Sequence, residues 1–318
     1  MIQDFRHDAL TTFHGLPIIA FAYGDAADVE PADIPEDVEA WAWRVGCEDM
    51  DSAAGDRIWA LFVASVDTTR VRALTLSSWD GEEAMSGWDD ARDALLADAS
   101  RFPNLEALFL GDVSSEMTEV SWIEQADPGP LLAAFPALVA FGMRGASALD
   151  MQPLVHENLR ELTMQTGGLP PQVVRTVGQS DLPALTGLDL YLGTSIYDGG
   201  AGADDLADVL SGTAFPALRH LGLRNAEDTD ALAALLAHAP VVAQLESLDL
   251  SLGTLGDEGV AALLAGQPLT HLRRLDLHHH WISDEMIARL WQALPEVDVN
   301  VDEALLGRDA DRFIAVAE

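Results

Sequence analysis

The sequence predicts an α/β fold built as a solenoid, in which short parallel strands alternate with helices along one coiled chain. The first basis is an apolar pattern, L-x-x-L-x-L, that recurs about every 28 residues over nearly the whole chain. The second is that each copy reads as a strand and is followed by a helical pattern. The third is a proline just upstream of several copies, where a helix must stop. These prolines are Pro103, Pro136, Pro183, Pro216 and Pro268.

The chain opens with residues 1–37, which lack the repeat and are expected to cover the first coil as an N-terminal cap. Within this cap, residues 17–22 are a predicted edge strand. The repeats then occupy residues 38–302. Residues 303–318 are expected to form a C-terminal cap with a closing strand at residues 312–316. Together these parts predict one structural domain.

Ten copies of the pattern predict about ten strands. Positions 1, 4 and 6 of the copies read Val38/Trp41/Trp43, Val71/Leu74/Leu76, Leu105/Leu108/Leu110, Leu138/Phe141/Met143, Leu159/Leu162/Met164, Leu185/Leu188/Leu190, Leu218/Leu221/Leu223, Leu245/Leu248/Leu250, Leu272/Leu275/Leu277 and Leu294/Val297/Val299. Positions 4 and 6 lie on one face of a strand, so they form the core. Neighbouring strands lie about 4.8 Å apart, whereas packed helices need an axis-to-axis spacing of about 8–10 Å. Because the helix layer is therefore longer than the strand layer, the stack bends with its sheet on the concave side.

Helices are expected between the strands. Ser283 precedes Asp284 and Glu285, which favours a capped helix start at that point. The unit that begins at Leu138 is only 21 residues long, so we expect a short helix there.

These units resemble leucine-rich repeats of the ribonuclease-inhibitor-like class, most closely over residues 248–259 (LDLSLGTLGDEG). The resemblance covers about residues 38–302 and implies a horseshoe with helices on its convex side. The whole chain resembles an uncharacterised bacterial leucine-rich-repeat family, which implies a fold but no activity. One departure concerns the Asn that the family places three residues after the last strand Leu. Positions such as Gly193, Ala226, Gly253 and His280 stand there instead, so these turns must satisfy their backbone otherwise, at His280 through a ring nitrogen.

The composition is strongly acidic, with 53 acidic side chains, 17 basic ones, no lysine and a net charge of −36. Such a surface repels phosphate backbones and anionic lipid, so we expect no nucleic-acid or membrane partner. The chain shows no secretory signal and no apolar run long enough to span a bilayer. A single cysteine, Cys47, excludes an internal disulfide. A cytoplasmic location is therefore expected, and no cofactor is indicated.

The candidate site lies on the concave face, which carries positions 3, 5 and 7 of each copy. Position 5 places an interrupted row of aspartates, Asp189, Asp249 and Asp276, on the C-terminal half, with Asp298 beyond them. Since like charges on neighbouring strands repel, a row kept at this cost suggests a cationic partner. The alternative is that Asp is simply abundant on this surface. The remaining predicted residues of this face are Tyr191, His220, Arg224, Ser251 and His278.

Tryptophans give a second candidate surface. Trp79, Trp88, Trp122 and Trp281 all fall in segments that follow a strand, on one edge of the solenoid. Trp is enriched at binding hot spots, so Trp79, Trp122 and Trp281 are predicted to contact a partner. The alternative is that these rings pack the insertions onto the sheet.

The sequence therefore favours a non-enzymatic protein–protein interaction module with a basic partner. The alternative is a metal-dependent enzyme or accessory factor around Asp276 and His278, which share one strand face. Regulation of a GTPase by an exposed arginine, such as Arg144 or Arg224, is implied by the resemblance alone. We find no nucleophile, phosphate-loop or zinc-protease motif, and no catalytic residue is predicted.

Overall fold

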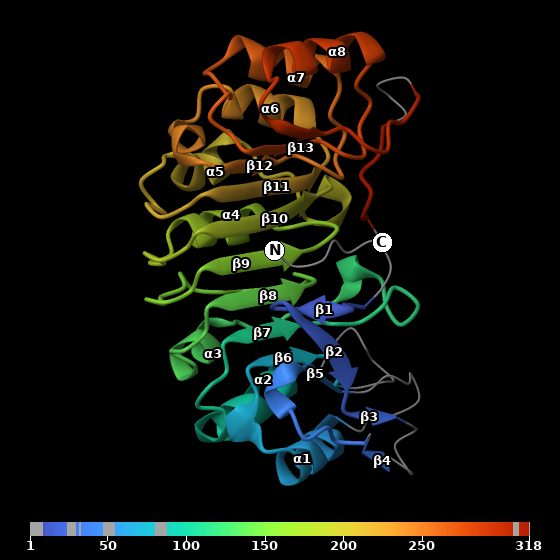
Figure 1. The fold of residues 1–318 in the computed structure, drawn as a ribbon, viewed down its shortest axis with the longest axis vertical. Coiled ribbons are helices and arrows are strands. Elements are labelled where there is room, and N and C mark those ends of the chain that lie inside the picture. The colour runs from blue at the N-terminus through green and yellow to red at the C-terminus, as the bar shows by residue number, and fades with distance from the viewer. Residues whose placement is uncertain are drawn as a thin grey trace. The chain divides into compact units, whose positions relative to one another are not determined.

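The computed structural model describes residues 9–23, 30–31, 33–46, 55–79, 88–307 and 312–317, so Cys47 lies outside the described residues. The chain divides into two compact units, one ending at Gln165 and one spanning Thr166–Ala317. Each unit is a stack of parallel strands in chain order with helices on one side (Figure 1). The predicted α/β leucine-rich-repeat solenoid is thereby confirmed. The organisation as a single domain stays a prediction.

Unit 1 contains the N-terminal segment and the first five repeats. Its main sheet consists of β1 (Thr12–Phe13), β2 (Leu16–Ala20), β5 (Ala42–Val45), β6 (Ala73–Leu76), β7 (Ala107–Leu110), β8 (Ala140–Arg144) and β9 (Glu161–Gln165). Neighbours from β2 to β9 are parallel, whereas β1 is antiparallel to β2. A separate antiparallel pair joins β3 (Ala22–Tyr23) to β4 (Glu30–Pro31). The helices are α1 (Gly55–Ser65), α2 (Trp88–Ala97) and α3 (Gly129–Ala134).

Between β8 and β9 the structure has no helix, whereas the sequence predicted a short one. The connection between Arg144 and Glu161 consists of isolated bridges, turns and bends.

Unit 2 contains the remaining repeats. Its strands are β10 (Gly187–Gly193), β11 (His220–Ala226), β12 (Ser247–Asp249), β13 (Arg274–Asp276) and β14 (Asp298–Asn300). Its helices are α4 (Pro171–Gly178), α5 (Ala203–Leu210), α6 (Thr229–Leu236), α7 (Asp257–Ala265) and α8 (Asp284–Ala293). The position-4 leucines stand in register from β10 to β13 and are fully buried. As predicted, Ser283 caps α8, because its hydroxyl accepts a hydrogen bond from the Met286 amide.

The predicted register is two residues off in the first and the tenth copy. Trp43 pairs with Leu74, so Trp43 fills position 4 and Val45 fills position 6. Val299 likewise pairs with Leu275 and fills position 4 of the last copy. A slip of two residues keeps every side chain on the same face, so apolar alternation alone did not exclude it.

The N-terminal segment of unit 1 covers the concave face of its own sheet. Leu10 and Phe13 pack on side chains at positions 3 and 5 of the strands, which are Ala42, Ala73, Ala107, Phe109 and Ala140. The rings of Phe13 and Phe109 meet edge to face, with centroids 5.9 Å apart. The run of alanines leaves the space into which this segment fits.

The C-terminal residues 312–317 form no strand, in contrast to the expected closing strand. They cross the end of β11 and the turn that follows β12. The Ala315 amide donates to the Leu252 carbonyl, and the Val316 amide donates to the Asn225 side chain. The amides of this segment therefore bond to a side chain at the end of β11 and to a turn, and β14 receives no new neighbour from it.

Candidate interaction surface

The concave face of unit 2 carries the predicted aspartates at position 5. In register across the five strands, this position holds Asp189, Gly222, Asp249, Asp276 and Asn300. Gly222 interrupts the row for a steric reason. A Cβ atom at Gly222 would lie 2.1 Å from the Asp189 carboxylate.

Each aspartate of the row has a partner within the chain. The Asp189 carboxylate lies 3.0 Å from the His220 ring nitrogen, and Asp249 lies 3.3 Å from the Arg224 guanidinium. Arg224 also donates to the Ser251 hydroxyl and lies over the Tyr191 ring, 5.0 Å from its centroid.

Asp276 is the most heavily bonded member of the row. It accepts hydrogen bonds from Arg274 at 2.7 Å and from Asn300 at 3.0 Å. Its other contact is with His278, whose Nδ1 lies 2.6 Å away. Both carboxylate oxygens of Asp276 are therefore engaged by side chains of the same unit.

These side chains lie on the predicted face, yet they are nearly closed off from solvent. Asp189, Asp249 and Asp276 are 5–7% exposed, and His278 is 6% exposed. Tyr191, Arg224 and Ser251 are at most 4% exposed. The concave strip, meaning these residues and His220, is a packed network of polar side chains that bond to one another.

Burial and pairing shift the pKa values in opposite directions along the strip. Burial raises the pKa of Asp189, but its hydrogen bond to His220 and the charges of His220 and Arg224 outweigh this and lower it. Burial lowers the pKa of His220, but the hydrogen bond and charge of Asp189 outweigh this and raise it. Burial raises the pKa of Asp249, and the charges of Asp189 and Asp276 raise it further against the pull of Arg224. Burial also acts on Asp276, but its three hydrogen bonds lower that pKa well below the ordinary value.

The geometry does not favour the alternative sites. Among the described residues, no group of three or more His, Cys, Asp or Glu side chains is placed to hold a metal ion. Asp276 and His278 bind each other and their neighbours instead of facing a shared open position. Arg144 is 0% exposed and Arg224 is 4% exposed, so neither presents the free guanidinium that a GTPase regulator needs.

The four edge tryptophans separate into two groups. Trp79, Trp88 and Trp281 are buried, and Trp281 packs edge to face against both His279 and Phe313. Trp122 is 53% exposed and donates its indole N–H to Glu119 at 2.7 Å. Packing of the insertions accounts for the first three rings, so Trp122 alone of the four presents its face to solvent.

His280 performs the structural task expected at the turn position that usually holds Asn. One ring nitrogen lies 2.9 Å from the Val301 carbonyl, and the other accepts the Ile282 amide at 3.0 Å. Burial lowers the pKa of His280, which favours the neutral ring that both contacts require.

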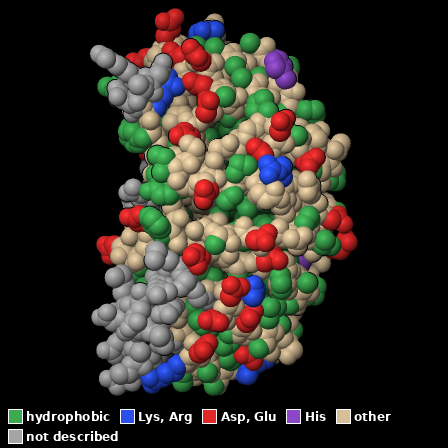
Figure 2. Space-filling view, turned by 180° about the vertical axis from the view of Figure 1, so that it is seen from behind, with side chains coloured by type: hydrophobic (Ala, Val, Ile, Leu, Met, Phe, Trp, Pro, Cys, Tyr) green, Lys and Arg blue, Asp and Glu red, His purple; other side chains and the backbone are tan. Residues whose placement is uncertain are grey.

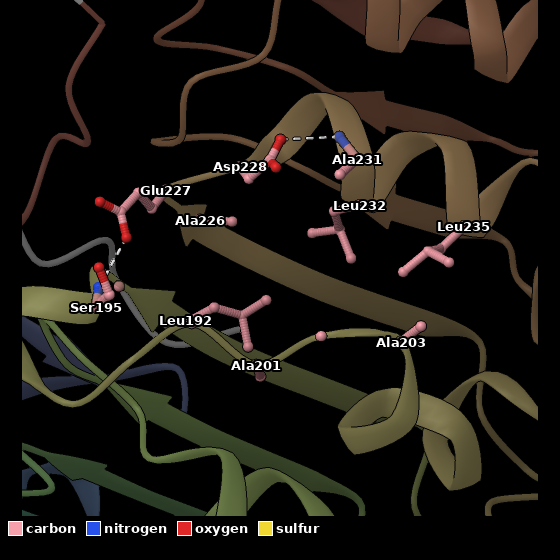
Figure 3. Close-up of a pocket in the computed structure, with 13 residues that line it drawn as sticks. Leu192, Ser195, Ala201, Ala203, Ala226, Glu227, Asp228, Ala231, Leu232 and Leu235 are labelled. Carbon is pink, nitrogen blue, oxygen red and sulfur yellow. Dashed lines mark hydrogen bonds between the residues drawn. The ribbon is translucent and has the colours of Figure 1, made fainter.

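The structure also contains a surface that the sequence did not indicate, a cavity of about 740 Å³ in unit 2. Its apolar lining comes from Leu192, Ala201, Ala203, Ala226, Ala231, Leu232 and Leu235. Figure 3 shows Leu232 and Leu235 projecting from α6 toward the side that Leu192 and Ala203 form. We call this the α5–α6 cavity.

Exposed carboxylates lie beside this cavity. Glu227 and Asp228 are part of its lining, while Asp198 and Asp204 lie in the adjoining loop and first turn of α5. We call these four side chains the acidic edge. Acidic side chains are also scattered over the face of the molecule in Figure 2, with few arginines among them.

Comparison with known proteins agrees with the observed architecture. A family described as Leucine Rich repeat matches residues 244–264 and 269–285. A solved Bacteroides fragilis protein has a TM-score of 0.75 and 28% sequence identity, over 82% of this chain and 73% of that one. An internalin from Listeria monocytogenes has a TM-score of 0.34 and 18% identity, over 84% of this chain and 75% of that one. No curated protein sequence matches.

In the described part of the chain, none of the helices has the length and apolar character needed to cross a membrane. The repeated strand–turn units, the parallel sheets and the matches above agree with one another. The chain is a leucine-rich-repeat protein that resembles an uncharacterised bacterial family of this fold.

Proposed function

We propose that this chain is a non-enzymatic protein-interaction module that binds a basic segment of another protein at the acidic edge of unit 2. The leucine-rich-repeat fold supports the general role, because stacked repeats present extended surfaces that suit protein binding. The finer part, a basic partner at this edge, rests on the charge distribution.

The observation that carries this proposal is that most of the chain's arginines are already paired with its own carboxylates. At least ten of the 17 arginines form ion pairs within the chain; they are Arg44, Arg70, Arg72, Arg92, Arg101, Arg175, Arg224, Arg273, Arg274 and Arg312. The 53 acidic side chains outnumber the 17 arginines about three to one, which leaves a net charge of −36. A basic partner would supply the missing charge and gain from electrostatic steering.

The two concave faces are less suited to this contact than the edge. The concave face of unit 1 is covered by Leu10 and Phe13 of the same chain. The concave strip of unit 2 has its aspartates bound to His220, Arg224 and Arg274. In this proposal the strip serves as a rigid support next to the edge, and Trp122 remains a candidate contact on unit 1.

The carboxylates of the acidic edge are exposed and only partly occupied. Glu227 accepts the Ser195 amide through one oxygen, at 2.8 Å, and Asp228 accepts the Ala231 amide through one oxygen, at 3.1 Å. In each case the second oxygen is the one offered to a guanidinium or ammonium group. Because the first oxygen is fixed by the backbone, the second is held in a defined direction, which lowers the entropy cost of binding.

Two charge-matched variants test the proposal. The edge variant combines Asp198→Asn, Asp204→Asn and Glu227→Gln, which keep side-chain size and the Ser195 contact. The control variant combines Glu258→Gln, Glu285→Gln and Glu296→Gln, three exposed acids at α7, at α8 and beyond α8. Each variant removes three charges, so the net charge is the same in both.

The assay is affinity capture from the native host at its own ionic strength, with captured proteins quantified by mass spectrometry. We expect a basic protein that elutes at modest salt, is retained by the control variant, and is lost from the edge variant. Equal retention by both variants contradicts the placement at the edge. Equal loss from both would show general attraction to a charged surface and would also contradict it.

A further inference from the structure

The α5–α6 cavity gives the proposed contact an apolar component, and this inference rests on the proposed function. We infer that the cavity receives two or more aliphatic side chains from a short basic amphipathic segment of a partner protein, whose Arg or Lys residues meet the acidic edge.

The cavity exists because two neighbouring repeats differ in length. The copy that begins at Leu185 is 33 residues long, whereas the copy that begins at Leu218 is 27. The extra residues lie between β10 and α5, where residues 194–202 form a loop, while only Glu227 and Asp228 separate β11 from α6. As a result α5 packs mainly on α4, and α6 packs mainly on α7. Between α5 and α6 the helix layer opens.

The lining selects an apolar group of some size. Its volume, about 740 Å³, falls in the range of about 300–1,000 Å³ found for ligand sites and exceeds the space that one aliphatic side chain fills. Leu192 and Leu232 form buried walls, and Leu235 is half-buried. Ile196, which directly follows the lining residue Ser195, is 80% exposed.

The charges beside the cavity exclude an anionic ligand. The N-termini of α5 and α6 both open toward the cavity, and such termini often bind anions. Here each already holds a carboxylate of its own chain, since Asp205 accepts the Gly202 amide and Asp228 accepts the Ala231 amide. A phosphate or carboxylate would meet Glu227 and Asp228 instead of free donors. The neighbouring Gly199–Gly202 run is therefore not a phosphate loop, and a cationic group fits best.

The walls are fixed before any partner arrives. The Leu192 carbonyl accepts the Leu169 amide, and the Thr194 amide donates to the Gly167 carbonyl. Gly193 adopts a positive φ of 69°, and a Cβ there would lie 2.0 Å from the Gly167 carbonyl oxygen. Because its walls are preformed, this chain loses little conformational entropy on binding, which favours capture of a partner segment that becomes ordered as it binds.

The test fills the cavity from exposed positions, so that the core is left intact. Ala231→Phe and Ala203→Phe each place a ring in the lining from an exposed helical position. Ala234→Phe is the matched control, because Ala234 is exposed on α6 and does not line the cavity. Thermal melting of all three variants checks that the fold is retained.

The probe is a fluorescently labelled 14-residue peptide with Leu at helical spacing on one face and Arg on the other. Companion peptides replace Leu by Ser or Arg by Glu, and n-octylamine serves as a small cationic amphiphile. Affinity is measured by fluorescence anisotropy at 0.15 M salt, or by calorimetry for the amine. Amide shifts of residues 192–203 and 226–235 locate the site.

We expect the Arg/Leu peptide to shift these amides, with at least tenfold weaker binding to Ala231→Phe and Ala203→Phe. Ala234→Phe should change affinity by less than threefold. The Ser peptide should bind at least tenfold more weakly, and the Glu peptide should not bind. Unchanged affinity in both filled variants overturns the inference, as does binding of octylamine without binding of the peptide.

The two proposals can fail separately. If partner capture is lost in the edge variant but persists in Ala231→Phe, the cavity inference fails while the proposed function stands. If capture is equal in the edge variant and the control variant, the proposed function itself fails.

Discussion

Asp112 anchors the N-terminal segment on unit 1, so Asp112→Ala should release that segment. The buried carboxylate of Asp112 accepts the Leu10 amide at 2.7 Å, the Arg44 guanidinium at 2.8 Å and the Thr75 hydroxyl at 2.8 Å. It therefore links the segment to β5 and β6 through one network. Removing it takes away the carboxylate that pairs with the largely buried Arg44 guanidinium, which keeps its bond to the Leu10 carbonyl, and it takes away the acceptor of the Leu10 amide and the Thr75 hydroxyl.

The size of the expected destabilisation follows from these contacts. Breaking a buried ion pair by removing one partner costs about 3–5 kcal/mol. The matched control is Glu39→Ala, which removes an Arg–carboxylate pair to Arg70 whose side chains are 42% and 47% exposed. An exposed pair of that kind contributes about 0–1 kcal/mol. The two substitutions thus remove the same type of interaction with a several-fold difference in cost.

The loss of stability in the N-terminal segment is best measured by hydrogen exchange with mass spectrometry, which reports on each segment separately. A global melting curve is less suitable, because unfolding of a chain with two units need not be two-state. In Asp112→Ala, the peptide covering residues 9–20 should lose protection by roughly 100- to 4,000-fold. In Glu39→Ala its protection should fall less than about sixfold. Protection of residues 187–300 should not change in either variant. If the peptide keeps its protection in Asp112→Ala, the account of the N-terminal segment is wrong.

Four further substitutions test the concave strip of unit 2, and the effect of each is measured by the hydrogen-exchange protection of β10–β13. Asp276→Asn should destabilise unit 2 at pH 7 by about 1–3 kcal/mol, because hydrogen bonds to the charged carboxylate are lost. Asp249→Asn should also destabilise unit 2, by about 3–5 kcal/mol, because it leaves the buried Arg224 guanidinium without its charged partner at 3.3 Å; an unchanged or more stable protein would contradict this. Gly222→Ala should destabilise by about 1–3 kcal/mol, because the added methyl displaces the Asp189 carboxylate; an unchanged or more stable protein would refute the steric account. The stability that His220 contributes should be fully present below its unfolded pKa near 6.5, and it should be lost as the pH rises through the raised pKa of the folded state. The stability that Asp189 contributes should be fully present above its unfolded pKa of 3.8, and it should be lost on acidification. His220→Gln should therefore flatten the alkaline side of the pH profile, and an unaltered profile would count against the pair.

The repeat could be predicted from sequence because its leucines obey a local rule. Leu188, Leu221, Leu248 and Leu275 recur at strand spacing and stand in register in the structure. The first and last copies were misplaced by two residues because Trp41 and Val297 satisfy the same alternation as the true core positions. Register at the ends depends on which backbone groups pair, and this is a property of neighbouring coils.

The site was less accessible to sequence reasoning. The pattern placed Asp189, Asp249 and Asp276 on the predicted face, but it did not show their pairing with His220 and Arg224 of β11 and with Arg274 of β13. The α5–α6 cavity arises from a difference between two repeat lengths that is visible in the sequence. What that difference does to helix packing is set by tertiary contacts, so its consequence could not be read from either repeat alone.

The absence of lysine allows a direct test of the central claim, that the acidic edge of unit 2 contacts a basic protein partner. A carbodiimide couples carboxylates to amines without a spacer, and the side chains of this chain offer no amine to compete. We would treat the chain in host lysate at native ionic strength and locate the coupled carboxylates by mass spectrometry. The account predicts adducts with one basic partner concentrated at Asp198, Asp204, Glu227 and Asp228. Adducts spread evenly over both units, or concentrated on the helices away from this edge, would contradict it.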